Sequence, residues 1–492
     1  MSPHTKKYPF SVEREHAADP LDIDTPLVVD LDGTLVRTDL LVESFLALIK
    51  QNPLYIFAVL FWSLKGKAYL KRQISQRVNL DVSVLPYHQE LLGHLREQRN
   101  QGRRIVLATG TDERIARQVA DHLNVFDEVF GSDGTTNLSG RHKRDRLVEK
   151  FGEKKFDYAG DSRGDIPVWS SARKAVLVNV PGNLLDPITR IAEVEQVFQA
   201  QKKGIKPYIE ALRLHQWLKN ILVFVPLVTA HRFVEPALIA KNLIAFLAFG
   251  LCASSVYLLN DLIDLSADRH HPRKKKRPFA AGDVSPLVGL FASPGLLGLS
   301  LLISLVLPLY FIWMLVIYYL LNLAYSFYLK QVALLDVILL AGLYTMRIMA
   351  GSASVDIWPS SWLLAFSTFI FLSLALVKRY DELVIMNAET GKVRVRGYEI
   401  VDKELLASLG SGSGYVAVLV LAIYISTGKA EIFYTRHHFI WLLCPLLLYW
   451  ISYVWLIAHR GAMLDDPLVF ALKDRVSRIT LFLGGIVLLL AR

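Results

Sequence analysis

Asn260, Asp264 and Asp268 are oxygen-bearing residues spaced four apart at the end of a long apolar segment. At positions i, i+4 and i+8 they are expected to line one face of a helix. Such ligands suit Mg²⁺, which commonly holds substrate phosphates through a few carboxylates. The basic run 269–277 follows and would neutralise further phosphate charge. The alternative is a charge cluster that only sets membrane topology, but topology requires the basic residues and not an acidic stripe.

A second pair of carboxylates, Asp30 and Asp32, follows the apolar segment 26–29, which reads as a buried strand. Asp30 is suited to attack a phosphoryl group as a nucleophile and form an aspartyl-phosphate. Asp32 is then placed to protonate the leaving oxygen and later to activate water. These two residues predict a phosphatase site in the first part of the chain.

Further phosphate-binding groups follow other apolar segments. Thr109 and Gly110 end the expected strand 105–108 and offer a hydroxyl and an amide to a phosphate. Lys143 would balance the charges of the phosphate and the nucleophile. Asp161 and Asp165 follow the segment 156–159 and can hold Mg²⁺ against the phosphate.

These four motifs, in this order, resemble those of the haloacid dehalogenase phosphatase superfamily. The resemblance covers roughly residues 20–195 and implies an α/β, Rossmann-like domain with a helical cap and one Mg²⁺. It implies a metal site that includes Asp30, Asp32, Asp161 and Asp165. Thr109, Gly110 and Lys143 are then the phosphate-binding residues.

Composition indicates a membrane protein of more than one domain. The chain has 492 residues, 53% of them hydrophobic, and a mean hydropathy of +0.34. We expect a phosphatase domain at 1–198 with its cap near 39–100, a linker at 199–207 and a membrane domain at 208–492. Cys252 and Cys444 lie in distant apolar segments and predict no disulfide. The net charge of +10 favours a membrane surface and phosphate substrates over nucleic acid.

Within the expected cap, residues 54–62 form a strongly apolar run that is followed by Lys65, Lys67, Lys71 and Arg72. The run is too short to cross a bilayer. It is either part of the core of the cap or an interfacial segment that dips into lipid.

The membrane domain is expected to be an all-α polytopic bundle of about nine spans. With a cytosolic N-terminus, the loops at 273–277, 330, 378–403 and 460–475 face the cytosol, in agreement with the positive-inside tendency. The polar N-terminus predicts that the phosphatase domain is cytoplasmic, on an inner (plasma) membrane. The expected spans are centred near Val225, Phe249, Leu299, Tyr318, Leu343, Phe369, Leu419, Leu447 and Gly485.

The acidic stripe, the span pattern and a cytosolic pocket resemble the UbiA superfamily of intramembrane transferases. Aromatic-acceptor members carry a second Asp-x-x-x-Asp set after the sixth span. Here Asp381 and Glu382 are adjacent instead, so they would point about 100° apart on a helix. This segment and others (213–220, 271–282, 396–398 and 465–475) are similar to those of the decaprenyl-phosphate phosphoribosyltransferase group.

That resemblance implies at least one Mg²⁺ on Asn260, Asp264 and Asp268, with Asp264 and Asp268 also catalytic. Lys378, Arg379 and Arg396 would bind the 5-phosphate of a phosphoribosyl pyrophosphate donor. Arg347, inside a span, is expected to meet a bundle-facing partner or the substrate. Further candidate substrate-binding residues are Arg213, Lys219, Asn220, Arg277, Tyr325, Lys330 and Tyr398.

The fusion predicts two consecutive reactions. The first transfers 5-phosphoribose from phosphoribosyl pyrophosphate to a polyprenyl phosphate, and the second removes the terminal phosphate of that product. Two alternatives remain at this point. One is an aromatic-acceptor prenyltransferase of quinone or pigment synthesis with a phosphatase of unrelated specificity. The other is a transferase with a non-catalytic docking module.

Overall fold

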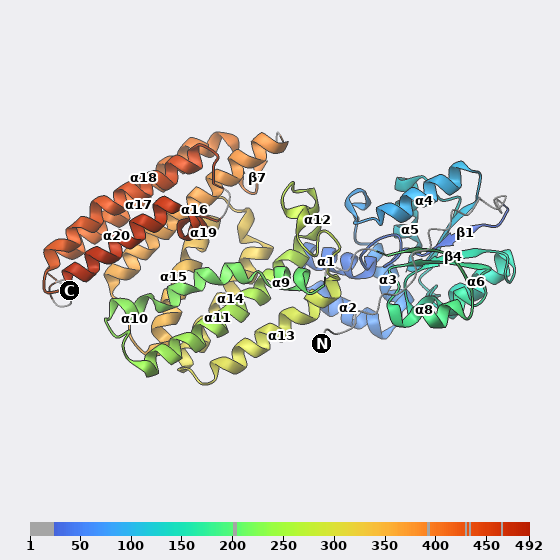
Figure 1. Ribbon diagram of the computed structural model, residues 1–492, viewed down its shortest axis with the longest axis horizontal. Coiled ribbons are helices and arrows are strands. Elements are labelled where there is room, and N and C mark those ends of the chain that lie inside the picture. The colour runs from blue at the N-terminus through green and yellow to red at the C-terminus, as the bar shows by residue number, and fades with distance from the viewer. Residues whose placement is uncertain (1–23, 200–203, 391–393, 429–430, 432–433, 464–465) are drawn as a thin grey trace, which may run out of the picture. The chain divides into compact units, whose positions relative to one another are not determined.

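The chain divides into two compact units, Met1–Lys202 and Lys203–Arg492 (Figure 1). The computed structural model describes residues 24–199, 204–390, 394–428, 431, 434–463 and 466–492. The polar N-terminus, residues 200–203 of the expected linker and Asp465 lie outside the described residues. Each unit is described by itself below.

The first unit is built on a six-stranded, wholly parallel sheet with the strand order β3-β2-β1-β4-β5-β6. The order reverses between β1 and β4, and ligands of doubly wound sheets bind at the carboxyl ends of the strands at such a point. Asp30 and Asp161 directly follow these two strands. The strands are β1 Leu27–Val29, β2 Ile105–Asp112, β3 Glu128–Ser132, β4 Asp157–Gly160, β5 Lys174–Val178 and β6 Glu193–Phe198.

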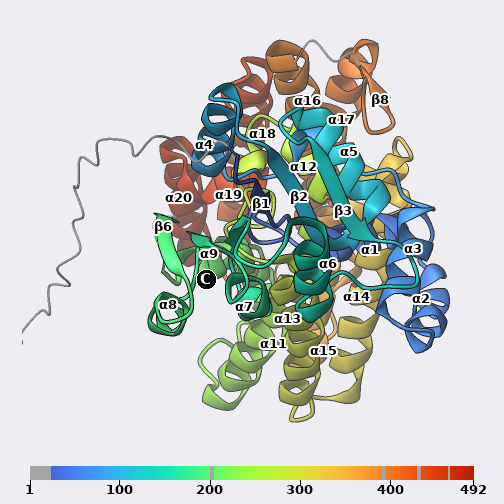
Figure 2. The ribbon, with the colours of Figure 1, turned by 90° about the vertical axis from the view of Figure 1, so that its right-hand side faces the viewer.

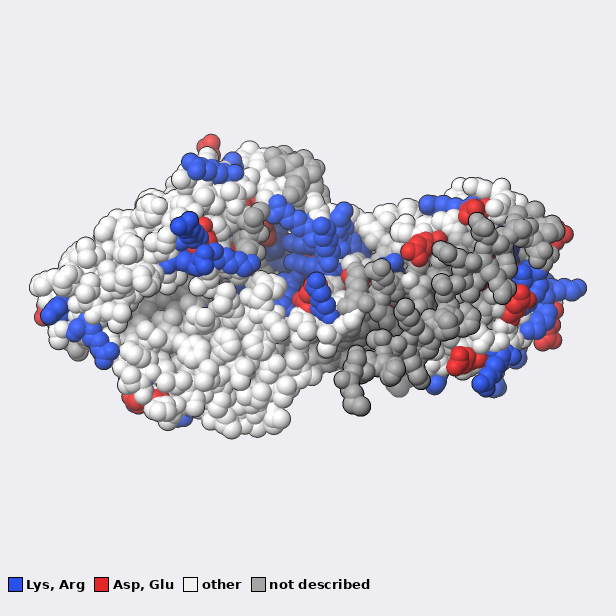
Figure 3. Space-filling view, viewed as in Figure 1, with Lys and Arg blue, Asp and Glu red and all other residues white. Residues whose placement is uncertain are grey.

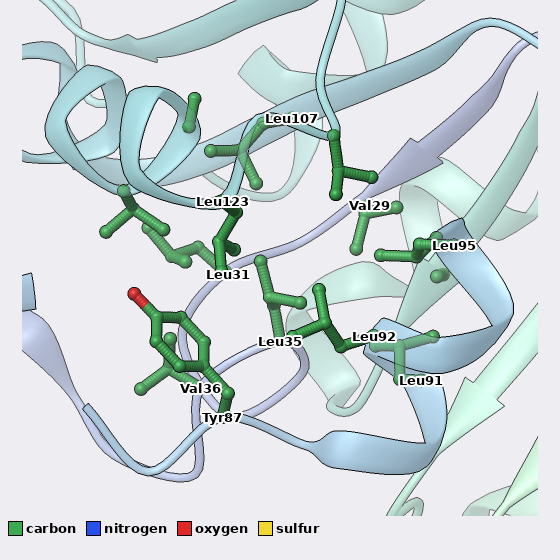
Figure 4. Close-up of a cluster of buried hydrophobic side chains, with 14 of the residues drawn as sticks. Val29, Leu31, Leu35, Val36, Tyr87, Leu91, Leu92, Leu95, Leu107 and Leu123 are labelled. Atoms are coloured by element: carbon green, nitrogen blue, oxygen red, sulfur yellow. The ribbon is translucent and has the colours of Figure 1, made fainter. Parts of the chain in front are cut away.

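Alternate residues of the central strands enter two separate cores, because successive side chains of a strand point to opposite faces. Leu27 and Val29 belong to one core (Figure 4), while Val28 belongs to the other. Helices α4 Gln89–Asn100 and α5 Glu113–Leu123 supply the first core. Helices α6 Arg141–Phe151, α7 Ile166–Trp169 and α8 Gly182–Thr189 supply the second. The sheet is thus covered on both faces, as the predicted α/β class requires.

The segment predicted as a cap, 39–100, contains four α-helices. Helices α1 Leu40–Gln51, α2 Tyr55–Leu64 and α3 Lys67–Ser75 lie next to one another (Figure 2). They share a small core of their own around Trp62 and Ile74. Helix α4 instead packs on the sheet through Leu91, Leu92 and Leu95. Only α1–α3 therefore have the packing expected of a separate helical layer.

The second unit is helical. Seven of its described helices are long and apolar enough to cross a membrane. The predicted count of nine spans is not confirmed. The first expected span is a 3₁₀ helix, η3 Leu214–Phe224, joined to the five-residue α10 Val225–Thr229, and the last, α20 Arg475–Ala491, has 17 residues. The seven helices lie within α11 Pro236–Ile263, α13 Pro286–Ser304, α14 Leu309–Phe327, α15 Leu335–Val355, α16 Ser361–Thr390, η6–α17 Ile400–Ser426 and η8–α18 His437–His459.

The acidic stripe lies where one helix passes into the next. Helix α11 ends at Ile263, and α12 spans Leu265–His270, with Asp264 as the residue between them. The backbone N–H of Asp264 still donates to Asn260 (2.9 Å), and that of Asp268 to Asp264 (2.8 Å). The i, i+4 geometry expected from the sequence is kept across this junction, although the stripe is not on one uninterrupted helix.

Candidate active sites

In the first unit, Asp30 lies at the centre of a network of buried charges. The Nζ of Lys143, on α6, donates to Asp30 Oδ1 (2.8 Å) and to the Tyr158 hydroxyl (2.9 Å). That hydroxyl donates to Asp165 Oδ1 (2.6 Å), and Lys143 lies 3.6 Å from the same carboxylate. The strand ends and α6 therefore bring Asp30, Lys143 and Asp165 together.

Asp30, Asp161 and Asp165 form a group of carboxylates able to hold a metal ion. One oxygen of each lies within 4.8 Å of the others. Burial, and then the neighbouring carboxylates Asp165 and Asp30, raise the pKa of Asp161 to about 8. Burial raises the pKa of Asp30 to about 7, although Lys143 opposes this shift. Three crowded carboxylates with one ammonium group fit a divalent cation, because its charge would offset their repulsion.

Asp32 has a separate environment. Its carboxylate accepts hydrogen bonds from the Leu40 N–H (2.8 Å) and from the Thr111 hydroxyl (2.5 Å), which set its orientation. Burial raises the pKa of Asp32 to about 6. A carboxyl group with such a pKa is suited to give and take a proton near neutral pH. Its side chain is outside the three-carboxylate group found among the described residues.

The turn that follows Asp30 and Asp32 needs a glycine. Gly33 has φ +79°, a conformation that residues with a side chain rarely adopt. A Cβ at Gly33 would also collide with the carboxylate of Asp161. Glycine thus lets the loop that carries Asp30 and Asp32 approach Asp161.

The structure adds residues that the motifs do not reveal. Thr109, predicted to bind phosphate, accepts the Thr111 N–H at its hydroxyl (3.0 Å). Lys71 of α3 donates to the Gly110 carbonyl (2.5 Å) and to Asn137 (2.7 Å), so it brings a cation from α1–α3 to the second phosphatase motif. Basic residues are frequent near Lys71 in the sequence, so only the fold distinguishes it.

The second unit contains a cavity of ≈ 420 Å³. Nine Lys or Arg and six Asp or Glu residues line it, so its walls carry excess positive charge. In Figure 3, Lys and Arg gather on this unit around α12, whereas most of its visible surface is uncharged. The predicted metal-binding and substrate-binding residues that line the cavity are Arg213, Lys219, Asn260, Asp264, Asp268, Arg277, Tyr325, Lys330, Lys378 and Arg396.

Basic residues hold the acidic stripe. Lys330 Nζ lies 2.8 and 2.6 Å from the two carboxylate oxygens of Asp264. Arg277 donates to Asp268 (2.6 Å) and to Asp261 (3.1 Å). The Ser326 hydroxyl donates to the Asn260 side chain. Three oxygen ligands on one cavity wall, with cations beside them, fit a Mg²⁺–phosphate group.

Asp466 was not singled out by the sequence. Its carboxylate accepts from Lys219 (2.7 Å) and Lys378 (2.9 Å), and from the Tyr344 hydroxyl (3.2 Å). Burial alone would raise the pKa of Asp466, but the two ammonium groups hold this pKa well below its usual range. Asp466 therefore fixes two of the predicted substrate-binding lysines on the cavity wall.

Arg347 faces the interior of the bundle. It donates to Asn220 (3.1 Å) and to the Tyr318 hydroxyl (2.9 Å), and its guanidinium lies 5.0 Å from the centre of the Tyr318 ring. It also lines the cavity. This intramembrane charge thus has partners and remains within reach of a ligand.

Three predicted substrate-binding residues, Asn220, Arg379 and Tyr398, are outside the cavity lining. Arg379 is 1% exposed and binds Asp336 and Glu382, and it donates to the Tyr325 hydroxyl (2.6 Å). Tyr398 donates to Asp336 (2.5 Å). In this arrangement Arg379 and Tyr398 position other groups.

Asp381 and Glu382, expected to diverge, both line the cavity. Glu382 is bound by Arg379, and its carboxylate lies 3.6 Å from Arg396. The charge of Glu382 is therefore compensated by two guanidinium groups, while Asp264 and Asp268 of the stripe are bound by Lys330 and Arg277.

Two family models match the chain. The UbiA prenyltransferase family model matches residues 221–472, and the haloacid dehalogenase-like hydrolase model matches residues 27–170. Among solved structures, a UbiA homolog from Archaeoglobus fulgidus bound to GPP and Mg²⁺ covers 57% of this chain and 99% of its own, at 16% identity and a TM-score of 0.44. A phosphoserine phosphatase in apo form covers 36% of this chain and 94% of its own, at 14% identity and a TM-score of 0.26.

Curated relatives match one or both units. An uncharacterized protein, y4nM of Sinorhizobium fredii, is 36% identical over 96% of this chain and 93% of its own. Nodulation protein NoeC of Azorhizobium caulinodans is 35% identical over 57% of this chain and 91% of its own. Decaprenyl-phosphate phosphoribosyltransferase of Mycolicibacterium smegmatis is 33% identical over 58% of this chain and 92% of its own. The chain belongs to the UbiA prenyltransferase family and carries a haloacid dehalogenase-like domain ahead of its membrane-embedded transferase domain.

Proposed function

We propose that the chain transfers 5-phosphoribose from phosphoribosyl pyrophosphate to a polyprenyl phosphate and then dephosphorylates the product to polyprenylphosphoryl ribose. The observation that carries the first step is the cavity of the second unit, where an oxygen-ligand stripe shares one space with nine Lys or Arg residues. A donor with phosphates at both ends needs such a distribution of charge. The similarity to decaprenyl-phosphate phosphoribosyltransferases supports this substrate class.

The stripe is the proposed site of the leaving group. Asn260, Asp264 and Asp268 would hold Mg²⁺, which when bound supplies charge neutralisation to the departing pyrophosphate. Arg277 and Lys330 already contact two of these carboxylates and can turn to the pyrophosphate oxygens. The 5-phosphate would bind Lys378 and Arg396, which also line the cavity.

The acceptor needs little activation. The oxygen of a polyprenyl phosphate is already anionic, so attack at the ribose C1 requires positioning and no strong general base. The apolar tail of the acceptor requires a site inside the membrane, and seven helices long and apolar enough to cross a membrane support such a site. A cytosolic opening on an inner (plasma) membrane would give the cavity access to a soluble, charged donor.

The product of transfer carries a terminal phosphomonoester, which the first unit is suited to hydrolyse. Asp30 would attack the phosphorus while Asp32 protonates the leaving ribose oxygen, and water activated by Asp32 would then release phosphate. Lys143 is held beside Asp30 and stays protonated, because the carboxylates raise its pKa despite its burial. Asp30, Asp161 and Asp165 would hold Mg²⁺.

The transfer step is tested with membranes that contain the full chain and radiolabelled donors. Label from phosphoribosyl pyrophosphate should enter the lipid fraction, and label from prenyl pyrophosphate should not enter aromatic products. Asp264→Asn and Asp268→Asn should abolish lipid labelling and leave phosphatase activity intact, because each unit has its own candidate metal ligands. Glu404→Gln, an exposed carboxylate-to-amide change on α17, is the matched control. Transfer near the wild-type rate in either stripe variant, or incorporation of the prenyl label, would contradict the proposal.

A further inference from the structure

One face of α2 exposes a cluster of apolar side chains. Six of the seven large apolar residues exposed on the described part of the first unit come from 54–64, and Val197 is the seventh. Phe57 is 68% and Leu64 is 83% exposed. We call the cluster the α2 surface, and it consists of Leu54, Ile56, Phe57, Leu60, Phe61 and Leu64.

The opposite face of α2 is packed. Trp62 is buried, and Tyr55, Ala58 and Val59 pack with it against α1 and α3. Helix α2 is therefore apolar on all sides, a pattern typical of helices that are enclosed by protein or lipid. The packed face belongs to the core of the cap, as one of the two possibilities drawn from the sequence predicted, and it holds the α2 surface in place as part of the fold.

The chain segment that contains the α2 surface carries charges of a single sign. Residues 44–80 contain six Lys or Arg residues and no Asp or Glu. Among the basic residues, Lys50, Lys65, Lys67 and Arg77 are exposed. The Nζ of Lys65 lies 5.1 Å from the centre of the Phe61 ring and 5.2 Å from that of Tyr69. Exposed lysines beside an apolar surface suit a boundary between hydrocarbon and anionic headgroups.

We propose that α2 is an interfacial anchor that binds the surface of an anionic lipid bilayer. Its ten residues have a length of roughly 15 Å at 1.5 Å per residue. This is half the thickness of a bilayer core, so the helix lies along the interface and does not cross it. Apolar side chains enter the headgroup boundary, and the surrounding lysines bind lipid phosphates.

Membrane binding of α2 would also serve the phosphatase reaction, a consequence that rests on the proposed function. Helix α3, which follows α2, carries Lys71 to the second phosphatase motif. Binding of α2 to the bilayer would hold the phosphatase site close to the membrane surface, where a lipid-linked phosphomonoester presents its head. Binding itself does not depend on what the phosphatase hydrolyses.

The test measures where α2 lies in full-length protein reconstituted in vesicles of phosphatidylglycerol and phosphatidylcholine. A fluorophore is attached through Phe57→Cys, and in a second sample through Gln101→Cys, an exposed position at the end of α4. Both carry Cys444→Ala, while Cys252 is buried. A lipid-borne nitroxide should quench the label at position 57 several-fold more than the label at 101, and aqueous iodide should show the reverse preference.

The second part of the test varies the charge of the lipid and of the protein. Replacing phosphatidylglycerol by phosphatidylcholine, or introducing Lys50→Gln, Lys65→Gln and Lys67→Gln together, should lower nitroxide quenching at position 57 at least twofold. A label at 57 that iodide reaches as well as at 101 would overturn the proposal. Protection of the label at 57 from both quenchers would assign the α2 surface to a protein partner and would also overturn the proposal. Quenching at 57 that does not depend on lipid charge would refute the preference for anionic lipid.

An activity measurement separates this inference from the proposed function. The double variant Phe57→Glu and Phe61→Glu should hydrolyse a water-soluble aryl phosphate at the wild-type rate but a vesicle-borne phosphomonoester at least fivefold more slowly. Val197→Glu is the matched control for an exposed apolar-to-acidic change. Lipid quenching at 57 without hydrolysis of any lipid-borne phosphomonoester would retain the anchor and reject the proposed phosphatase substrate. Equal hydrolysis of the vesicle-borne ester by variant and wild type would show that the anchor does not serve catalysis.

Discussion

At the scale of single residues, the cavity of the second unit is formed by residues that line it and by residues that hold the lining residues in place. Lys378 and Arg396 line the transferase cavity, whereas Arg379, next to Lys378 in the chain, is buried against Asp336. Two cations adjacent in sequence therefore have different tasks. The sequence motif alone does not tell which of the two faces the cavity, because the cavity-facing side of a helix is known only once the neighbouring helices are placed.

Lys378→Ala and Arg396→Ala are each expected to weaken binding of phosphoribosyl pyrophosphate more than binding of inorganic pyrophosphate. The loss for the 5-phosphorylated donor should be about 1.5–3 kcal/mol, as for a charge-assisted hydrogen bond. Calorimetry on detergent-solubilised protein gives both affinities. Arg379→Ala is the comparison, and it should lower thermal stability and affect both ligands alike. If Lys378→Ala and Arg396→Ala reduced both affinities equally, these residues would not bind the 5-phosphate.

Two carboxylates of the second unit, Asp466 and Asp336, could not be assigned a role from the sequence. The phosphatase motifs and the Asn260–Asp268 stripe are recognisable because their spacing along the chain matches a strand end or a helix face. Asp466 has no such pattern, since its partner Lys219 is 247 residues away. Asp336 is likewise 43 residues from Arg379. Only tertiary packing brings these pairs together.

At the scale of elements, the hydrophobic pattern predicted the type of each secondary-structure element better than its boundaries. Three of the six strands were expected from short apolar segments, at 26–29, 105–108 and 156–159, and seven of the expected spans are helices of sufficient length. The first expected span is instead short and begins as a 3₁₀ helix, which a count of apolar residues does not register. The predicted cap included α4, because periodicity shows an amphipathic helix but not the surface on which it packs.

Helix α15 provides a test of close packing. Gly351 approaches the backbone of η3 so closely that a Cβ would collide with the Val223 carbonyl, whereas Gly342 of the same helix has nothing within 4 Å of that position. Gly351→Ala should therefore destabilise the second unit by about 1–3 kcal/mol. Gly342→Ala should not. Thermal unfolding in one detergent compares them, and equal midpoints for both variants would show that this contact is not tight.

At the scale of the whole molecule, the chain joins a unit with phosphatase motifs to a helical unit with a charged cavity. The y4nM relative spans both units, whereas the decaprenyl-phosphate phosphoribosyltransferase of M. smegmatis covers 58% of this chain. The order of the two proposed reactions follows from chemistry, because transfer yields the phosphomonoester that a phosphatase consumes. We therefore predict that the two units act one after the other on the same lipid.

Asp30→Asn tests this claim most directly. The amide is nearly isosteric with the carboxylate but cannot form an aspartyl-phosphate, so hydrolysis should stop while transfer continues. Membranes free of other phosphatases are supplied with polyprenyl phosphate and phosphoribosyl pyrophosphate, and the extracted lipids are analysed by mass spectrometry. The variant is predicted to accumulate polyprenylphosphoryl-5-phosphoribose, and the wild type to yield polyprenylphosphoryl ribose. The same ratio of phosphorylated to dephosphorylated lipid in both samples would contradict consecutive action of the two units.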